Sequence, residues 1–421
     1  MARAKGENEY RKRWQAADSR LFHLGKKLDI LGQLRWPESV RHEFFHELSK
    51  KNTTLPSFDV VPLTCSRERE ELADIQAELK ADHPIPKFLS AVAQSFQDAL
   101  SMLEAKGSPH FTELSVALYG STRAEDDSKA TETVKLAKRF LRAFRNFHEE
   151  NLVPPEAVCI LGSSVAGEIQ KEIARVFPKE ELSVALTDEI SAKAVANALG
   201  VRIRESTCFA PHDVLQLLNH ELFVHTLTLL NGRAQPYQTF GISSPYTTLT
   251  QEGLAVFSEF VTNSIDIGRI ARLSARVVAI DMALTGASFV EVFRYFRSQR
   301  QSEEESYFST QRIFRGGNGS EGVVFTKDLV YIRGLLEVRS FLLEALETER
   351  YSSIDMLFSG RVDLQHIPEL VPLLESGELI GPTYLPDWML NRSNVLTYLL
   401  SFAAFQGLNN KGSKSQGRKK Q

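Results

Sequence analysis

Residues 219–232 read NHELFVHTLTLLNG, and this short stretch decides the kind of fold that we expect. The stretch is apolar on nearly every side of a helix and follows the apolar run VLQLL, so the helix should lie in the protein core. Burial of His220, Glu221 and His225 is unfavourable unless these side chains are paired or hold a metal ion. The stretch therefore predicts a core helix that carries a polar site.

The spacing of the two histidines constrains the shape of that helix. Residues five apart, such as His220 and His225, are separated by about 140° on an ideal α-helix. Both could face one ion if a π-bulge widened the helix, and such bulges are common at functional sites. A helix that loosens near His225 would have the same effect. Either form would give the two-histidine arrangement of a zinc peptidase, with Glu221 as its base.

A second motif competes with this one. Residues 42–46 read HEFFH, which matches the HExxH signature of zinc peptidases. The surrounding helix, SVRHEFFHELSKKN, is polar on most of its circumference, whereas a catalytic helix needs a buried and rigid setting. The acidic residues that follow belong to a charge run typical of a solvated surface. We interpret HEFFH as a chance match and expect His42 and His46 to lie apart from any metal site.

The third ligand should lie downstream, in TLTQEGLAVFSEFV (248–261). Thr250 is a suitable N-cap for an apolar helix, which would place Glu252 in its first turn, and Gly253 permits close packing. Glu252 is the predicted third ligand, and Glu259 is expected to support or replace it. A His/His/Glu set is typical of zinc peptidases.

The rest of the chain is expected to be mostly helical around a small sheet. Alternating residues predict strands at 182–189 and 201–206, with a short helix, SAKAVANALG, between them. Helical periodicity and turn residues predict earlier helices at 8–33, 38–50, 66–81, 85–105 and 130–150. We therefore predict an α+β protein, predominantly helical, with a helical N-terminal region (1–150), a catalytic region with the small sheet (151–405) and a disordered basic tail (406–421).

Composition and charge exclude several classes of protein. The 421 residues carry a net charge of -3, so we expect neither a nucleic-acid partner nor a membrane-surface role. The sequence contains no apolar run long enough to span a membrane, and its N-terminal stretch is polar. We therefore expect neither a membrane span nor a secretory signal. Cys65, Cys159 and Cys208 lie far apart without a CxxC pair, so we expect no disulfide, a buried Cys208 thiol and a cytoplasmic location. Nothing in the sequence indicates the oligomeric state.

The motif HELFVH (220–225) followed by QEGLA (251–255) resembles a known family. Its bacterial members are labelled "flavohaemoglobin expression-modulating QEGLA motif protein". Its animal members include the microtubule-associated tyrosine carboxypeptidase, which removes the C-terminal tyrosine of α-tubulin. The resemblance spans roughly 20–400 and includes LYGST (118–122), LTDEISAKAVAN (186–197), FRGG (314–317), FTKDLVYIRG (325–334), LFSGRVDLQHI (357–367) and PTYLP (382–386).

The resemblance implies a zincin-like metallopeptidase core with one Zn2+ per chain. His220, His225 and Glu252 would be its ligands, and Glu221 the general base. The implied activity is that of a zinc carboxypeptidase that removes a C-terminal, possibly aromatic, residue from a protein or peptide. The alternative is a non-catalytic, zinc-containing regulatory or interaction protein that affects gene expression, for which Glu221 would be dispensable.

Candidate substrate-binding residues lie in and before FTKDLVYIRG, which we expect within a long helix at about 321–346. Lys327 and Tyr331 share a helix face at this spacing. A carboxypeptidase needs a fixed cation for the terminal carboxylate, and Arg315, Lys327 and Arg333 are candidates. Tyr331 could stabilise an oxyanion. The alternative is a helix face stabilised by salt bridges alone.

Overall fold

The computed structural model describes residues 2–125, 127–149, 159–190, 193–197, 199–319 and 322–401, and its fold is α+β and predominantly helical. The elements before the sheet are α1 (Ala2–Lys27), η1 (Gly32–Leu34), α2 (Glu38–Ser49), α3 (Ser66–Glu78), α4 (Pro84–Glu104), α5 (Pro109–Tyr119), α6 (Ala130–Glu149) and α7 (Gly162–Val176). The sheet contains β1 (Ser183–Thr187), β2 (Ala194–Asn197) and β3 (Gly200–Arg204).

The elements after the sheet are almost all helical. They are α8 (Pro211–Leu217), η2 (Leu218–Thr226), α9 (Leu227–Arg233), η3 (Gln238–Gly241), α10 (Pro245–Val261), α11 (Ile267–Leu284), α12 (Phe289–Ser298), α13 (Glu303–Phe314), η4 (Lys327–Leu329), α14 (Val330–Glu347), α15 (Tyr351–Phe358), α16 (Ile367–Glu375) and α17 (Asp387–Leu390). Residues 392–401 are also helical.

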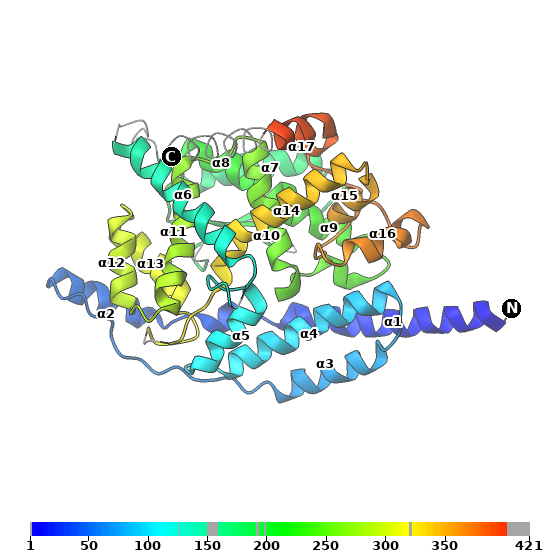
Figure 1. Cartoon of the computed structure of the whole chain (residues 1–421), viewed down its shortest axis with the longest axis horizontal. Coiled ribbons are helices and arrows are strands. Elements are labelled where there is room, and N and C mark those ends of the chain that lie inside the picture. The colour runs from blue at the N-terminus through cyan, green and yellow to red at the C-terminus, as the bar shows by residue number, and fades with distance from the viewer. Residues whose placement is uncertain are drawn as a thin grey trace, which may run out of the picture.

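The N-terminal helices pack against the elements that carry the site. Helices α1, α3 and α4 contact one another and lie along the lower side of the molecule in Figure 1. Asp18 on α1 accepts the backbone N–H groups of Gln238 and Thr239 at 2.6 and 2.9 Å. Phe88 on α4 stacks on Phe240, with 4.5 Å between ring centroids. Buried residues from both parts of the chain form one continuous core.

The three-stranded sheet has the order β1-β3-β2, with β1 parallel and β2 antiparallel to β3. Val201 and Ile203 on β3 are buried, as their alternation predicts. Strand β2 forms one edge of the sheet and contacts η2. The sheet therefore brings an edge strand to the helix that carries the HELFVH motif.

That helix is widened, which confirms one of the two alternatives that the five-residue spacing predicts. Residues Leu218–Thr226 form a π-helix between α8 and α9. The N–H group of Leu227 donates to the carbonyl of Leu222, five residues earlier. Leu222 and Val224 are fully buried, so the predicted core location is also confirmed.

Helices α10 and α14 cross at very short range. A Cβ atom added to Gly253 would lie 2.3 Å from the carbonyl carbon of Gly334. Only two glycines allow the two backbones to approach this closely, and the packing role predicted for Gly253 is confirmed.

Several predicted elements differ in the structure. The first helix ends at Lys27 because the Asp29 carboxylate accepts the N–H of Gly32 at 2.9 Å and stabilises a turn. The segment predicted as a helix, 191–200, contains strand β2, since pairing with β3 overrides the helical preference of its alanines. The long helix predicted from about 321 begins with a 3-10 turn at Lys327.

The helix that carries QEGLA also begins earlier than predicted. Its N-cap is Ser244, whose hydroxyl accepts the Thr247 N–H at 3.3 Å, and Pro245 occupies the first turn. Thr250 is therefore not the N-cap, and Glu252 lies in the body of the helix. The predicted boundary near residue 150 and the predicted tail at 406–421 lie outside the described residues.

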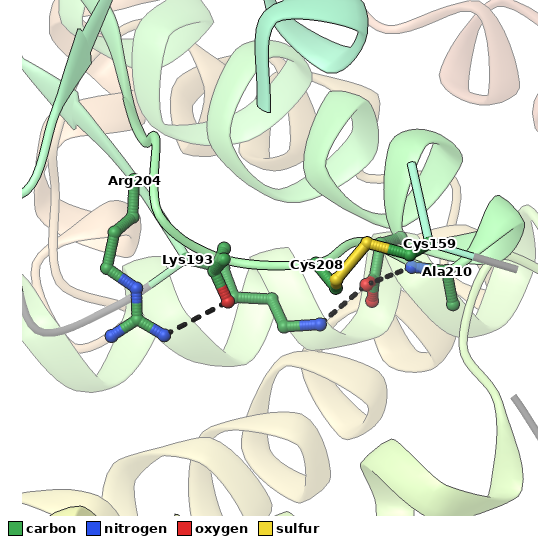
Figure 2. The surroundings of a disulfide bond; sticks show 7 residues. Cys159, Lys193, Arg204, Cys208 and Ala210 are labelled. Carbon is green, nitrogen blue, oxygen red and sulfur yellow. Dashed lines mark hydrogen bonds and ion pairs between the residues drawn. A yellow bond between two sulfur atoms is a disulfide. The ribbon is translucent and has the colours of Figure 1, made fainter. Parts of the chain in front are cut away.

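The expectation that the cysteines are reduced is wrong for two of them. Cys159 and Cys208 form a disulfide, so Cys208 is not a free thiol (Figure 2). Ile160 and Phe209, the next residues along, exchange two backbone hydrogen bonds and hold the two segments in register. The two cysteines are too far apart in the sequence for their spacing to indicate the pair. Because disulfides are rare in reducing compartments, the cysteines no longer support a cytoplasmic location. Cys65 is a buried free thiol.

No helix in the ranges described above combines the length and the apolar character that crossing a bilayer would require.

Candidate active site

The π-helix turns both histidines of the HELFVH motif toward one point. The imidazole rings of His220 and His225 lie 4.9 Å apart and nearly perpendicular, at 85°. A regular α-helix would direct them to different faces, and the wider turn removes most of that difference. Both side chains are largely buried, at 6% and 14% exposure.

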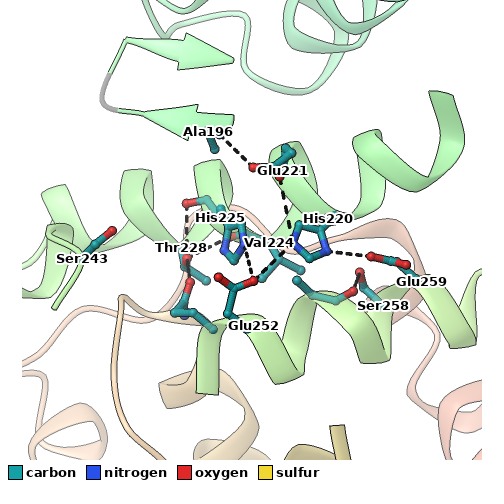
Figure 3. Close-up of polar contacts among 12 residues, drawn as sticks. Ala196, His220, Glu221, Val224, His225, Thr228, Ser243, Glu252, Ser258 and Glu259 are labelled. Carbon is teal, nitrogen blue, oxygen red and sulfur yellow. Dashed lines mark hydrogen bonds and ion pairs between the residues drawn. The ribbon is translucent and has the colours of Figure 1, made fainter. Parts of the chain in front are cut away.

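Glu252 on α10 completes the cluster (Figure 3). Its Oε2 atom lies 3.5 Å from Nε2 of His220 and 3.7 Å from Nε2 of His225. In a tetrahedral zinc site with ligand bonds of about 2.1 Å, the ligand atoms are about 3.4 Å apart. The three side chains are the group that could hold a metal among the residues that the structure describes. Their separations and chemistry fit one Zn2+ ion.

Glu259, the other acid that the sequence offered, lies behind the cluster. Its Oε1 atom is 2.7 Å from Nδ1 of His220, on the far side of the ring from Glu252. Arg269 on α11 donates to both Glu259 oxygens, at 2.5 and 2.6 Å, and Gln216 donates at 3.0 Å. A carboxylate at Nδ1 favours the tautomer that leaves the Nε2 lone pair free for an ion.

The charges of these buried groups are strongly coupled. Burial opposes ionisation of Glu252, but Lys327 and hydrogen bonds from the two histidines hold the pKa of its carboxyl well below the usual value. Burial similarly opposes ionisation of Glu259, yet Arg269 and His220 lower its pKa to about 2. Burial acts to lower the pKa of His220, but hydrogen bonds to the two carboxylates raise it to about 9. Without a metal ion, the two ionised carboxylates therefore stabilise a proton on the His220 ring, and a divalent cation would replace the proton on Nε2.

Glu221 lies beside the cluster without belonging to it. Its Oε1 atom is 4.0 Å from Nε2 of His220, and its Oε2 atom accepts the backbone N–H of Ala196 on β2 at 2.8 Å (Figure 3). The sheet edge thus fixes the direction of this carboxylate. Its side chain is 12% exposed, so it can reach both an ion and a substrate in the cavity.

A cavity of about 500 Å3 opens over the cluster. It is lined by both histidines, Glu221 and Glu252 and by strand β2, and a neighbouring hollow of about 230 Å3 shares His220, Glu221 and Tyr331 with it. The volume suits a side chain together with its backbone groups.

Three of the four predicted substrate-binding residues line this cavity. They are Arg315, Lys327 and Tyr331. Lys327 donates to Oε1 of Glu252 at 3.2 Å, so it orients that carboxylate. Tyr331 packs beside it, with the Lys327 Nζ 5.5 Å from the ring centroid. Burial and the charge of Arg312 lower the pKa of Arg315 to about 10.

The structure does not bring the fourth candidate, Arg333, to the cavity. Its guanidinium forms ion pairs with Asp127 and, at 2.9 Å, with Glu337. It lies on the side of α14 that meets the segment after α5, where Gly120 leaves room for it. A helix face stabilised by salt bridges, the alternative considered from the sequence, describes Arg333.

HEFFH lies on the surface, as predicted. His42 and His46 on α2 are 70% and 66% exposed, and their nearest acids are Glu38 and Glu47 on the same helix. Val40 and Phe44 form the buried side of that helix. Neither histidine belongs to the candidate metal cluster.

Sequence reasoning missed two arginines that complete the site. Arg269 fixes Glu259, and Arg361, in the loop after α15, lines the cavity and donates to the carbonyl of His225 at 3.1 Å. The stretch 357–367 contains Arg361, but its periodicity does not indicate which way that side chain points.

Fold and site together define a class of protein. It is an α+β, mostly helical protein whose buried His–His–carboxylate cluster has the donor set of a single-metal site. The family model described as microtubule-associated tyrosine carboxypeptidase matches residues 42–407, most of the chain. The chain therefore belongs to the microtubule-associated tyrosine carboxypeptidase family.

Other comparisons add little. No curated protein matches the chain. A solved structure from Colwellia psychrerythraea, described as a lipoprotein, is similar at 14% identity with a TM-score of 0.40, which is too low to indicate a shared fold. The match covers 80% of this chain and 64% of that one, so this chain spans slightly less than two thirds of that protein's length.

Proposed function

We propose that this protein is a zinc-dependent carboxypeptidase with a zincin-like core, which removes the last residue of a protein or peptide. The observation that carries the proposal is the convergence of His220, His225 and Glu252 through a widened helix, with Glu221 beside them. Membership of a carboxypeptidase family supports the reaction class.

The ligand set would be His220, His225 and Glu252. Zinc in such a site polarises the scissile carbonyl and lowers the pKa of a bound water molecule. Glu252 would bind through Oε2, because its other oxygen is held by Lys327. Glu259 and Arg269 hold the His220 ring at the correct angle.

Glu221 is the proposed general base. Its carboxylate would accept a proton from the attacking water and deliver it to the nitrogen of the leaving amino acid. The Ala196 N–H fixes one oxygen of this carboxylate, and the other oxygen lies 4.0 Å from Nε2 of His220. Tyr331 lines the cavity, and its hydroxyl would donate a hydrogen bond to the developing oxyanion.

Strand β2 offers a place for the substrate backbone. It is an edge strand, and Ala194, Val195 and Ala196 line the cavity. An extended peptide lying along this edge would reach the cluster with its C-terminal end.

The test combines metal analysis with digestion of a C-terminal peptide library, read by mass spectrometry with and without a chelator. We expect one zinc ion per chain and loss of single C-terminal residues that stops when the metal is removed. The Glu221→Gln variant should retain zinc but lose about 100- to 10,000-fold in kcat.

The exposed motif offers a matched control. His42→Ala and His46→Ala should leave zinc content and kcat unchanged, whereas His220→Ala and His225→Ala should abolish both. Full activity of Glu221→Gln, or an absence of stoichiometric zinc, would refute the proposal. If cells that carry the inactive Glu221→Gln variant kept the wild-type phenotype, that result would favour the regulatory alternative.

A further inference from the structure

Arg361 is a buried cation in the wall of the active-site cavity. Its side chain belongs to the loop between α15 and α16 and is 6% exposed. It lines the same cavity as His225, Glu221 and Glu252. Burial acts to lower its pKa, to about 10, although Glu221 and Glu252 oppose the shift.

The loop holds Arg361 in one direction. The backbone N–H of Arg361 donates to the carbonyl of Phe240 at 2.8 Å. Gly360 packs on the same residue, where an added Cβ would be 3.0 Å from the Phe240 carbonyl oxygen. Asp363 accepts the hydroxyl of Thr250 on α10 at 3.2 Å. These contacts tie the loop to the helix that carries Glu252.

The hydrogen-bond partners of the guanidinium are neutral. It donates to the Ser243 hydroxyl and to the carbonyl of His225, and its buried Nε–H has no partner among the residues that the structure describes. Two other buried cations in this wall are paired with acids, Lys327 with Glu252 and Arg312 with Asp328. Within the described part of the chain, no carboxylate oxygen lies within 4.0 Å of Arg361. The carboxylates of Glu221 and Glu252 act on Arg361 only from beyond ion-pair distance, so its guanidinium has no direct ion-pair partner among the described residues. A buried cation in this setting favours an anionic ligand.

We propose that Arg361 binds the C-terminal carboxylate of the substrate and thereby makes the enzyme an exopeptidase. The inference rests on the proposed carboxypeptidase function and deepens it. The terminal carboxylate lies one residue beyond the scissile bond, so its receptor must face the same cavity as the metal ligands. Each terminal nitrogen of the guanidinium carries a second N–H besides the one donated to Ser243 or His225, and such a fork matches a carboxylate.

The other sequence candidates fit this role less well. Lys327 already binds Glu252, and Arg333 lies outside the cavity in ion pairs with Asp127 and Glu337. Arg315 lines the cavity and is the competing candidate. Arg361 could instead be purely structural, since it holds the carbonyl of His225. A structural role would affect all ligands equally, whereas a receptor distinguishes a carboxylate from an amide.

The experiment uses a peptide ending in tyrosine, prepared as the free acid and as the C-terminal amide. Binding of both to zinc-loaded Glu221→Gln, which does not turn the peptide over, is measured by calorimetry. The same measurement is made with Arg361→Gln, Arg315→Gln or Arg35→Gln added. Arg35 also lines the cavity but is exposed, so it controls for loss of a positive charge.

We expect the Glu221→Gln protein to prefer the free acid. Arg361→Gln should weaken free-acid binding on the order of 100-fold and leave amide binding and zinc content unchanged. Arg35→Gln should change neither. Three results would overturn the proposal. The Glu221→Gln protein could bind acid and amide equally, Arg361→Gln could weaken the binding of both to the same extent, or only Arg315→Gln could weaken the binding of the acid selectively.

A folding defect does not remove the test. If Arg361→Gln unfolds, Arg361→Lys replaces it in the test. Lysine keeps the positive charge but lacks the two-pronged guanidinium, so the preference for acid over amide should still fall at least several-fold. An unchanged preference would contradict the proposal. Failure of the proposed function has a different signature, because binding is read without turnover. A protein that shows no zinc-dependent cleavage but prefers the acid through Arg361 refutes the carboxypeptidase and not the receptor.

Discussion

At the scale of single residues, two acids seven positions apart have different roles. Glu252 turns one oxygen toward both histidine Nε2 atoms, whereas Glu259 contacts Nδ1 of His220 from behind. Both lie on α10, and from the sequence either could have been the ligand. The choice depends on which side of the His220 ring each carboxylate reaches, and this is set by how α10 packs against the π-helix.

Glu259 should therefore tune the metal without binding it. Replacing Glu259 by Gln keeps its size but removes the charge at Nδ1 of His220, so zinc affinity should fall about 10- to 100-fold. Competition with a chromogenic chelator measures this affinity. Glu70→Gln, an exposed site on α3, is the matched control and should have no effect. Unchanged affinity in Glu259→Gln would show that the contact with His220 has no influence on the metal.

At the scale of elements, the site depends on three pieces of structure. The π-helix supplies two histidines and Glu221, α10 supplies the two acids, and β2 supplies the N–H that holds Glu221. A side-chain bond joins the first two, since Ser258 on α10 donates to the Asn219 carbonyl at 3.0 Å, and Thr228 on the adjoining helix α9 donates to Gln251 on α10 at 2.8 Å. A shift of α10 would move Glu252 away from the histidines.

Gly253 offers a direct test of that coupling. In Gly253→Ala the added methyl group meets the backbone of Gly334, so α10 and α14 must separate. We expect a loss of about 1–3 kcal/mol in the free energy of unfolding and weaker zinc binding, both measured on the purified variant. Gly167→Ala on α7 makes the same change where no atom lies within 4 Å, and should stabilise by up to about 1 kcal/mol. Equal effects at both positions would exclude a specific role for the crossing.

At the scale of the whole molecule, the disulfide joins the sheet to the site. Cys159 and Cys208 are 49 residues apart and enclose α7 and all three strands. The segment after Cys208 leads directly into α8, where Asp213 accepts the Ala210 N–H at 2.8 Å and pairs with Lys193 at 2.7 Å. The disulfide thus fixes the sheet insertion to the start of the helix that carries the histidines.

Loss of this link should lower stability and activity together. A closed loop of this length stabilises a fold by about 4 kcal/mol, so the Cys159→Ser/Cys208→Ser variant should melt well below the wild type. Because β2 orients Glu221, kcat should fall while zinc content is unchanged. Calorimetry and peptide turnover measure the two effects. Reductant should lower the melting temperature of the wild type and leave that of the double variant unchanged. Identical melting temperatures of the two proteins without reductant would contradict the prediction.

The sequence by itself determined the features that depend on chain neighbours. The apolar run around residues 219–232 predicts the buried helix, the five-residue spacing predicts its widening, and the polar flanks of HEFFH predict its exposure. Only the tertiary structure decided features that join distant segments: strand β2 in place of a helix, the Cys159–Cys208 pair, the side of the His220 ring that Glu252 and Glu259 each contact, and the positions of Arg333 and Arg361. The physical reason is that periodicity reports which face of an element is apolar, whereas the partner of a charged or sulfur-bearing side chain depends on which other elements pack against that face.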